Sequence, residues 1–311
     1  MSGYEALRQS AAWIDLSPRG KIRATGEDRK RLLHALTTND VKSLNAGSGV
    51  YAFFLNEKGR ILADVYIYDL GDSLFLDSEP ETGAKIREHI DKYVIADDVT
   101  LTDETTEWAA IGLEGPASRT AATGLGVSVP DAQYGTREWG GGFAAHVAST
   151  GPEGIRLFLP VAELPGLLDR LSAAGIPQAS AEDARAVRIE NGMARYGEEI
   201  TESHLVQETQ VMHAVHFNKG CYLGQEIVER VRSRGQVHRL LAAVRFDTKT
   251  PPAPGAKLIA NGEPAGAIAS AAFSPEFDEA VGLAYVSVRA LQEKPEMLVQ
   301  GADPDIRAHI R

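Results

Sequence analysis

The feature of this sequence that most limits its fold is a pair of strand-like runs joined by a four-residue turn. The runs cover residues 50–55 and 60–68, with the turn sequence Asn-Glu-Lys-Gly at 56–59 between them. This chemistry predicts an antiparallel hairpin. Because side chains alternate along a strand, the apolar residues 61, 63, 65 and 67 share one face, and Asp64, Tyr66 and Tyr68 share the other with Leu62.

Helical and strand-like segments alternate through the rest of the chain. Apolar spacing predicts helices at 28–36 (capped by Asp28), 82–93, 164–171 and 181–189, with strands at 73–77, 99–102, 108–113, 143–147 and 155–159. After about residue 239 the segments are all strand-like: 240–246, 258–260, 266–271, 281–286 and 296–299. Asn261-Gly262 between two of them predicts a type I′ turn. The pattern indicates an α+β fold with antiparallel sheets and a small all-β domain at the end.

Composition excludes several classes of protein. The 311 residues are 43% hydrophobic, which suits a chain with a packed core and gives a prior of two domains. We find no apolar run long enough for a membrane helix and no signal peptide, so a cytoplasmic protein without a membrane partner is expected. The net charge of −11 argues against direct nucleic-acid binding as the main activity. The single cysteine, Cys221, excludes an intrachain disulfide.

The densest chemistry lies in residues 219–230. Cys221 stands just before a predicted helix that starts at Gln225, with Gly220 and Gly224 permitting tight backbone. A helix N-terminus and the neighbouring Lys219 would both favour a thiolate. The alternative is that Cys221 is a small buried apolar residue.

Five motifs in order along the chain carry a family resemblance. They are Asp15-Leu-Ser-Pro-Arg-Gly20, Leu36-Thr-Thr-Asn-Asp-Val41, Gly59-Arg-Ile-Leu-Ala-Asp64, Arg188-Ile-Glu-Asn-Gly192 and the signature Lys219-Gly220-Cys221-Tyr222-Leu223-Gly224-Gln225-Glu226. Together they resemble the YgfZ family of folate-binding proteins, which is related to the T protein of the glycine cleavage system, an aminomethyltransferase.

The resemblance implies a fold and its division. It implies a three-domain aminomethyltransferase-like ring around a central pocket for tetrahydrofolate or a one-carbon derivative. The expected domains are a discontinuous folate-binding core at 1–48 and 150–238, a ferredoxin-like α+β domain at 49–149 and a C-terminal β-barrel at 239–311.

The resemblance also implies roles for single residues. Asp64 would lie against the reacting nitrogens of folate, and Glu190 would bind the pterin edge, whose adjacent N–H groups suit one carboxylate. Tyr51 and Tyr68 match positions that pack on the ligand, and Tyr196 is a further candidate. Cys221 and Asp64 are the residues expected to carry any chemistry.

Departures from the aminomethyltransferase direct the functional expectation. This chain has Gln225 where that enzyme has arginine, Cys221 where it has no cysteine, and Ala63-Asp64 where it usually has two aspartates. The expected function is therefore folate-dependent assembly or repair of [4Fe–4S] proteins, with an indirect effect on tRNA modification and with iron–sulfur client or assembly proteins as partners. The alternatives are a tetrahydrofolate-dependent one-carbon (aminomethyl) transferase and a pure binding module, and the chemical step stays open.

Two further groups of residues have ordinary explanations. His213, His216 and Cys221 fit no standard zinc spacing, so no metal is expected. The basic residues between Arg230 and Arg239 are expected to form a solvated strand and turn, the alternative being a contact for the folate glutamate tail or an acidic partner.

Overall fold

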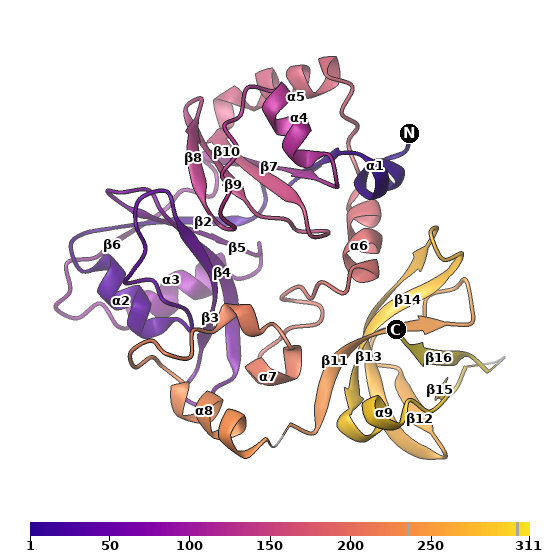
Figure 1. Cartoon of the computed structure of the whole chain (residues 1–311). Helices are drawn as coiled ribbons and strands as arrows, with labels where there is room; N and C mark the ends of the chain where they lie inside the picture. Colours follow the sequence, from indigo (N-terminus) through magenta and orange to yellow (C-terminus); the bar gives the residue numbers. More distant parts are fainter. Residues whose placement is uncertain (236, 303–304) are drawn as a thin grey trace. The chain divides into compact units, whose positions relative to one another are not determined.

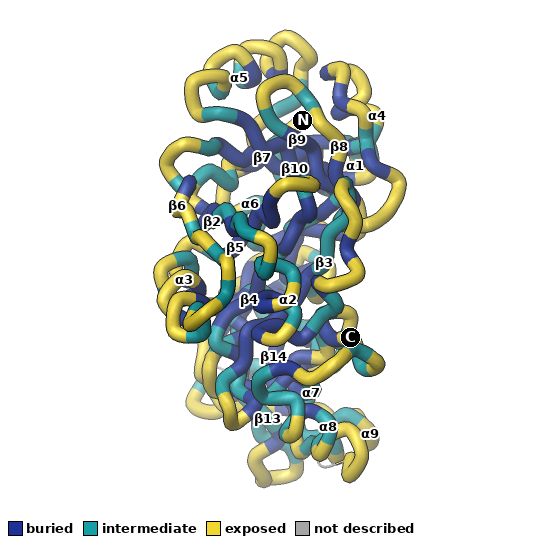
Figure 2. Tube along the Cα trace, turned by 90° about the vertical axis from the view of Figure 1, so that its left-hand side faces the viewer, coloured by how far each residue is buried: buried dark blue, intermediate teal, exposed yellow. Residues whose placement is uncertain are grey.

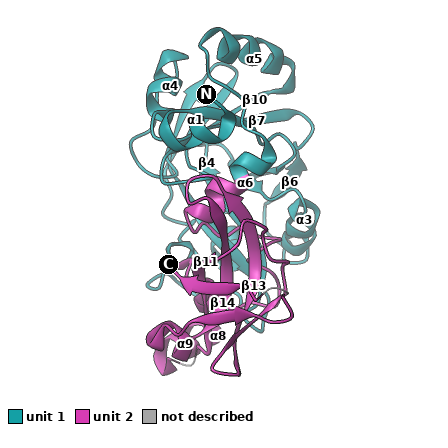
Figure 3. Cartoon of the chain, turned by 90° about the vertical axis from the view of Figure 1, so that its right-hand side faces the viewer, with its two compact units in different colours: residues 1–184, 213–225 teal, residues 185–212, 226–311 magenta. Residues whose placement is uncertain are grey.

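The computed structural model describes residues 1–235, 237–302 and 305–311. The chain divides into two compact units, which are coloured separately in Figure 3. The first unit contains Met1–Ala184 and His213–Gln225, and the second contains Arg185–Met212 and Glu226–Arg311. Each unit is described by itself below.

The first unit contains a five-stranded antiparallel sheet built around the predicted hairpin. Its strand order is β3-β4-β5-β2-β6, and β3 pairs with β4 throughout the hairpin. The strands are β2 (Gly20–Thr25), β3 (Gly49–Leu55), β4 (Ile61–Asp69), β5 (Leu74–Ser78) and β6 (Thr100–Asp103). Helices α2 (Arg29–Leu36) and α3 (Gly83–Asp91) contribute leucines and isoleucines to the same buried core as Ala63, Val65 and Ile67.

A second antiparallel sheet completes this unit (Figure 1). Its order is β1-β7-β10-β9-β8, made of β1 (Ala12–Asp15), β7 (Trp108–Glu114), β8 (Thr136–Trp139), β9 (Gly142–His146) and β10 (Gly154–Pro160). The helical segments that accompany it are α1 (Gly3–Gln9), α4 (Ser118–Gly124), η1 (Val161–Glu163) and α5 (Leu164–Ala173). Strands are mostly buried and the outer turns of α3 and α5 are exposed, as the colours of Figure 2 show.

Aromatic side chains from the two sheets form one buried cluster. Tyr68 and Phe75 come from the first sheet, and Phe143 and Phe158 come from the second. The rings meet mainly edge to face, with centroids 5.2–5.8 Å apart between sheets. Tyr68 belongs to the same face of β4 as Asp64, so this cluster packs against the end of that face.

The second unit ends in a closed six-stranded barrel of order β11-β14-β13-β12-β15-β16. The strands are β11 (Arg239–Phe246), β12 (Lys257–Ala260), β13 (Glu263–Ser274), β14 (Glu279–Ser287), β15 (Met297–Val299) and β16 (Arg307–Ile310). Helices α7 (Val206–Thr209) and α9 (Val288–Glu293) belong to this unit, whereas α6 (Ala181–Glu190), η2 (Met212–Ala214) and α8 (Gln225–Arg234) cross its boundary along the chain.

Most predicted elements are confirmed within a few residues, including the α+β class with antiparallel sheets and the terminal barrel. Asn261 and Gly262 have φ of 51° and 79°, the two positive values that a type I′ turn requires. Asp28 is the N-cap residue of α2, as predicted, but its side chain makes no capping hydrogen bond: the carboxylate accepts the Asp98 backbone N–H and pairs with Arg31. The expected strand at Arg230–Arg234 is wrong, since these residues continue α8.

Candidate functional site

Asp64 is held on β4 by a hydrogen bond from the neighbouring strand. The phenol of Tyr51 on β3 donates to Asp64 Oδ2 at 2.7 Å, and both side chains are 5% exposed. Alternation along β4 directs Asp64 away from the apolar core that receives Ala63 and Val65. Burial, and then the charge of Asp64, raises the pKa of Tyr51 well above its usual value. Tyr51 is therefore a permanent donor, and Asp64 is the acceptor.

Tyr66 belongs to the same face of β4 and is absent from the predicted site. Its ring centroid is 4.8 Å from that of Tyr51, and its ring is parallel to that of Tyr68 at 6.4 Å. The period-2 alternation from Asp64 to Tyr68 passes through Tyr66 and is the sequence signal that identifies it. Tyr68 itself is fully buried against Phe143 and Phe158, so in this structure its ring is part of the aromatic cluster.

A buried cluster of charged residues packs against the ring of Tyr66. The Arg156 guanidinium lies over the Tyr66 ring at 4.9 Å, and that of Arg19 lies 5.7 Å from the same centroid. Asp77 is fully buried and accepts hydrogen bonds from both arginines, 2.6 Å from Arg19 Nε. No sequence pattern joins these residues, which come from β5, β10 and the segment before β2.

The motif at residues 36–41 joins β3 to the segment at 213–216. Thr38 Oγ1 donates to the Ala214 carbonyl at 2.6 Å and accepts the Phe53 N–H at 2.9 Å. Asn39 Nδ2 donates to the carbonyls of Tyr51 and His213 at 2.8 and 3.0 Å. These side chains satisfy backbone groups on two segments far apart in the sequence, which explains the choice of Thr and Asn there.

Lys219 in the signature motif binds the end of α2. Its ammonium donates to the carbonyls of His34, Thr37 and Asn39 at 2.5–2.7 Å. Burial lowers the pKa of Lys219 to about 8. The His34 and Thr37 carbonyls are at the C-terminus of α2, where backbone carbonyls lack partners within the helix, and the Asn39 carbonyl follows it. Lys219 therefore binds this backbone segment, which explains the lysine better than activation of a thiol does.

The rest of the signature surrounds an exposed thiol. Cys221 is exposed, so the alternative of a small buried apolar residue is wrong. Gly224 has φ of 82°, and a Cβ there would lie 2.7 Å from the Asn56 carbonyl oxygen. Tyr222 is buried, and its backbone N–H donates to Gln225 Oε1 at 3.3 Å. Glu226 is exposed in the first turn of α8.

In the second unit, Glu190 is the last residue of α6 and is 3% exposed. Ser274 Oγ donates to Glu190 Oε1 at 2.5 Å. Arg188, two residues earlier in the same motif, binds Glu198 and Glu199 at 2.8–3.1 Å and so fixes the following loop. Tyr196 on that loop is 5% exposed, and its backbone forms an isolated parallel β-bridge with Ile200.

The histidines near the signature belong to no metal-binding cluster in the described part of the chain. Among residues 1–235, 237–302 and 305–311, no cluster of three His, Cys, Asp or Glu side chains has a geometry that could hold an ion. The His213 ring lies 5.5 Å from that of Tyr51, which makes it a neighbour of the Asp64 site.

In the same described ranges, no helix combines the length and the apolarity that membrane crossing would demand.

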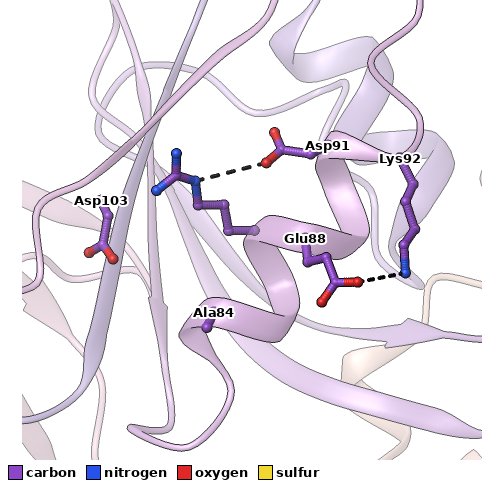
Figure 4. Close-up of a pocket in the computed structure, with 6 residues that line it drawn as sticks. Ala84, Glu88, Asp91, Lys92 and Asp103 are labelled. Carbon is purple, nitrogen blue, oxygen red and sulfur yellow. Dashed lines mark ion pairs between the residues drawn. The ribbon is translucent and has the colours of Figure 1, made fainter.

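A shallow hollow on α3 is lined by charged residues that pair with each other. Arg87 and Asp91 are 3.8 Å apart, and Lys92 and Glu88 are 3.1 Å apart, each pair one helical turn apart (Figure 4). These are the i,i+4 pairs of an ordinary solvated helix face. We therefore do not regard this hollow as a candidate functional site, in contrast to Asp64 and Glu190.

Comparisons with known proteins identify the family. The GCVT N-terminal domain matches residues 2–219, and the glycine cleavage T-protein C-terminal barrel domain matches residues 239–310. The aminomethyltransferase of Rubrobacter xylanophilus is 31% identical over 290 residues, covering 91% of this chain and 78% of that one. The aminomethyltransferase of Herpetosiphon aurantiacus is 26% identical, covering 99% of this chain and 87% of that one.

A solved structure has the same fold. The glycine cleavage system aminomethyltransferase T of Bartonella henselae matches with a TM-score of 0.90 at 21% identity, covering 99% of this chain and 87% of that one. The fold is thus that of a multi-domain, aminomethyltransferase-like protein with antiparallel sheets and a six-stranded barrel. The chain belongs to the glycine cleavage T-protein family.

Proposed function

We propose that this chain binds tetrahydrofolate and transfers a one-carbon unit, the aminomethyl group after which its relatives are named. The observation that carries the proposal is the buried Asp64 carboxylate with Tyr51 as its fixed donor. A second buried carboxylate, Glu190, offers the acceptor that the N–H groups of a pterin need. The chemistry of these two residues fits the folate that the family implies.

We assign a different role to each of the two carboxylates. Tetrahydrofolate supplies the nitrogens that carry the one-carbon unit. Asp64 would lie beside those nitrogens, where a carboxylate can accept their proton or stabilise positive charge that develops there. Tyr51 holds Asp64 in one orientation, and the rings of Tyr51 and Tyr66 give an aromatic wall. Glu190 would bind the pterin edge, and Tyr196, on the loop that follows α6, is a further candidate for contact with the ligand.

A thermal shift measurement tests the binding. Tetrahydrofolate at about 100 times its dissociation constant adds roughly 2.7 kcal/mol to the unfolding free energy of a protein that binds it. Wild type should show that stabilisation, and Glu190→Ala should lose most of it. Turnover of methylene-tetrahydrofolate by the purified protein then tests transfer, and tight binding without turnover counts against it.

Maintenance of iron–sulfur proteins is the second candidate function. The exposed Cys221 inside the signature favours it, together with Gln225 in place of arginine and the single acidic residue in Ala63-Asp64. Iron–sulfur client or assembly proteins would then be the partners, with tRNA modification affected through them. Cys221→Ser should fail to restore iron–sulfur enzyme activity in a strain lacking the protein. Full restoration would exclude a role for this thiol.

The domain division and the location belong to the same proposal. We propose a cytoplasmic protein whose barrel domain spans 239–311. The expected division of the rest into 1–48 with 150–238 and 49–149 would separate paired strands, because β2 pairs with β5 and β10 pairs with β7. A binding module in which folate only stabilises the fold is distinguished by Asp64→Ala, which would then leave partner binding and cellular function intact.

A further inference from the structure

The barrel contributes a side chain to the carboxylate at the end of α6. Ser274 is the last residue of β13 and is fully buried, and its hydroxyl is 2.5 Å from Glu190 Oε1. The two residues are 84 positions apart in the sequence, so the contact exists only because the barrel packs on this end of the helix.

Ser274 is the donor in this hydrogen bond, because the hydroxyl carries the proton and the carboxylate oxygen accepts it. The backbone N–H of Phe277 donates to Ser274 Oγ at 3.2 Å, so the hydroxyl already accepts one bond. A serine hydroxyl has one proton to donate. That proton is directed at Glu190, and the bond is the stronger kind in which the acceptor is a carboxylate.

Neighbouring residues connect the segment around Ser274 to the end of α6. The guanidinium groups of Arg245 and Arg311 both lie over the Phe277 ring, 5.2 and 5.0 Å from its centroid. Arg311 also donates to the backbone carbonyl of Glu190, one of the carbonyls that a helix C-terminus leaves without a partner. The β13–β14 turn, the last residue of the chain and the end of α6 are therefore linked to one another.

We infer that Ser274 is a positioning residue for pterin recognition. Its hydrogen bond sets the plane of the Glu190 carboxylate, and a planar carboxylate binds two adjacent N–H donors well only when its plane contains them. The ligand class is a bicyclic ring with neighbouring N–H donors, such as the amino-oxo edge of a pterin. This inference rests on the proposed function, in which Glu190 receives that edge.

The experiment measures tetrahydrofolate affinity by calorimetry under anaerobic conditions for the whole chain and its variants. Ser274→Ala is expected to weaken binding about tenfold, the typical loss for a hydrogen bond to a charged group. Ser270→Ala is the matched control. Ser270 lies on the same strand and is equally buried, and among the described residues its hydroxyl has no hydrogen-bond partner. It should bind tetrahydrofolate as wild type does.

Two further variants separate positioning from a general structural effect. In a Glu190→Ala background, Ser274→Ala should cause no additional loss of affinity, because it acts only through that carboxylate. Ser274→Cys keeps a side chain of similar shape with a much weaker donor, and it replaces Ser274→Ala if the alanine variant does not fold. Urea unfolding without ligand shows whether Ser274→Ala and Ser270→Ala differ in stability.

The outcomes distinguish this inference from the proposed function. Equal affinities of wild type and Ser274→Ala, or equal losses in Ser274→Ala and Ser270→Ala, overturn the positioning role and leave folate binding in place. Wild-type affinity in Glu190→Ala removes that residue from pterin binding and overturns the inference as well. Failure of wild type to bind tetrahydrofolate overturns both.

Discussion

The phenol of Tyr51 and the carboxylate of Asp64 form a buried pair, 2.7 Å apart, across two hydrogen-bonded strands. The two residues are 13 positions apart and are not directly opposite in register: Asp64 faces Phe53, and Tyr51 faces Tyr66. This diagonal across the hairpin is short enough for an aromatic side chain to span. It makes Tyr51 the residue on which the orientation of Asp64 depends.

Tyr51→Phe removes the hydroxyl that binds Asp64 and retains the ring. We expect the free energy of unfolding to fall by about 1–3 kcal/mol, because a buried carboxylate loses a donor. The stabilisation by tetrahydrofolate should fall too, since Asp64 is no longer fixed. Urea unfolding with and without the ligand measures both. Tyr93→Phe is the control and should behave as wild type, because Tyr93 follows α3 and packs against the core on the opposite face of β4.

Asp77→Asn leaves the guanidinium groups of Arg19 and Arg156 without their shared carboxylate. Breaking such a buried pair typically costs about 3–5 kcal/mol. Asp91→Asn, which removes one partner of an exposed i,i+4 pair, should cost at most about 0.5 kcal/mol. Urea unfolding at neutral pH compares the two variants, and similar small losses in both would contradict the importance of the buried cluster.

The buried contact of Asp77 with Arg19 and Arg156 also predicts how the free energy of unfolding depends on pH. Burial is the largest influence on the pKa of Asp77 and raises it, but Arg156 and Arg19 together bring it below the usual value. Because the pKa is lowered in the folded state, the contribution of Asp77 is present above the unfolded pKa of about 3.9 and is lost as the pH falls through the folded pKa. The difference in unfolding free energy between wild type and Asp77→Asn should therefore be constant from pH 7 to 5 and shrink below about pH 4.

The two glycines of the signature should respond differently to alanine. Gly224→Ala forces a Cβ to within 2.7 Å of the Asn56 carbonyl at a φ of 82°, so we expect a loss of about 1–3 kcal/mol. A Cβ at Gly220 would meet its nearest atom, His34 Nε2, at 3.6 Å, an ordinary contact. Gly220→Ala should therefore be tolerated. Thermal unfolding of both variants tests this difference in stability. Equal losses in the two variants would show that the backbone at Gly224 relaxes to accept a Cβ.

Lys219→Met removes three hydrogen bonds to the end of α2. The carbonyls of His34, Thr37 and Asn39 would lose their partly buried donor, and the segment that carries Cys221 would lose its anchor. We expect a loss of about 1–3 kcal/mol and faster amide hydrogen exchange in residues 213–225. Lys58→Met, in the exposed turn of the hairpin, is the control. Unchanged exchange at 213–225 would contradict the anchoring role.

Local periodicity and turn chemistry are enough to predict most of the secondary structure. The hairpin, most helices and the barrel strands follow from them, because these elements depend on neighbours along the chain. Strands β1, β2, β8 and β16 are not predicted, since each is short and is defined by its partners in a sheet rather than by its own pattern. The alternation on β4 also contains Tyr66, although the predicted site does not include it.

Which residues meet depends on the tertiary structure. Ser274 with Glu190, Arg156 with Asp77, and Lys219 with the end of α2 are separated by 79 or more positions, and no local pattern links them. Their interactions arise from packing of whole elements, which fixes the register and facing of side chains after local structure has formed. Sequence motifs thus mark Asp64, Glu190 and Cys221, whereas the fold makes the first two buried carboxylates with hydrogen-bond donors and leaves the third exposed.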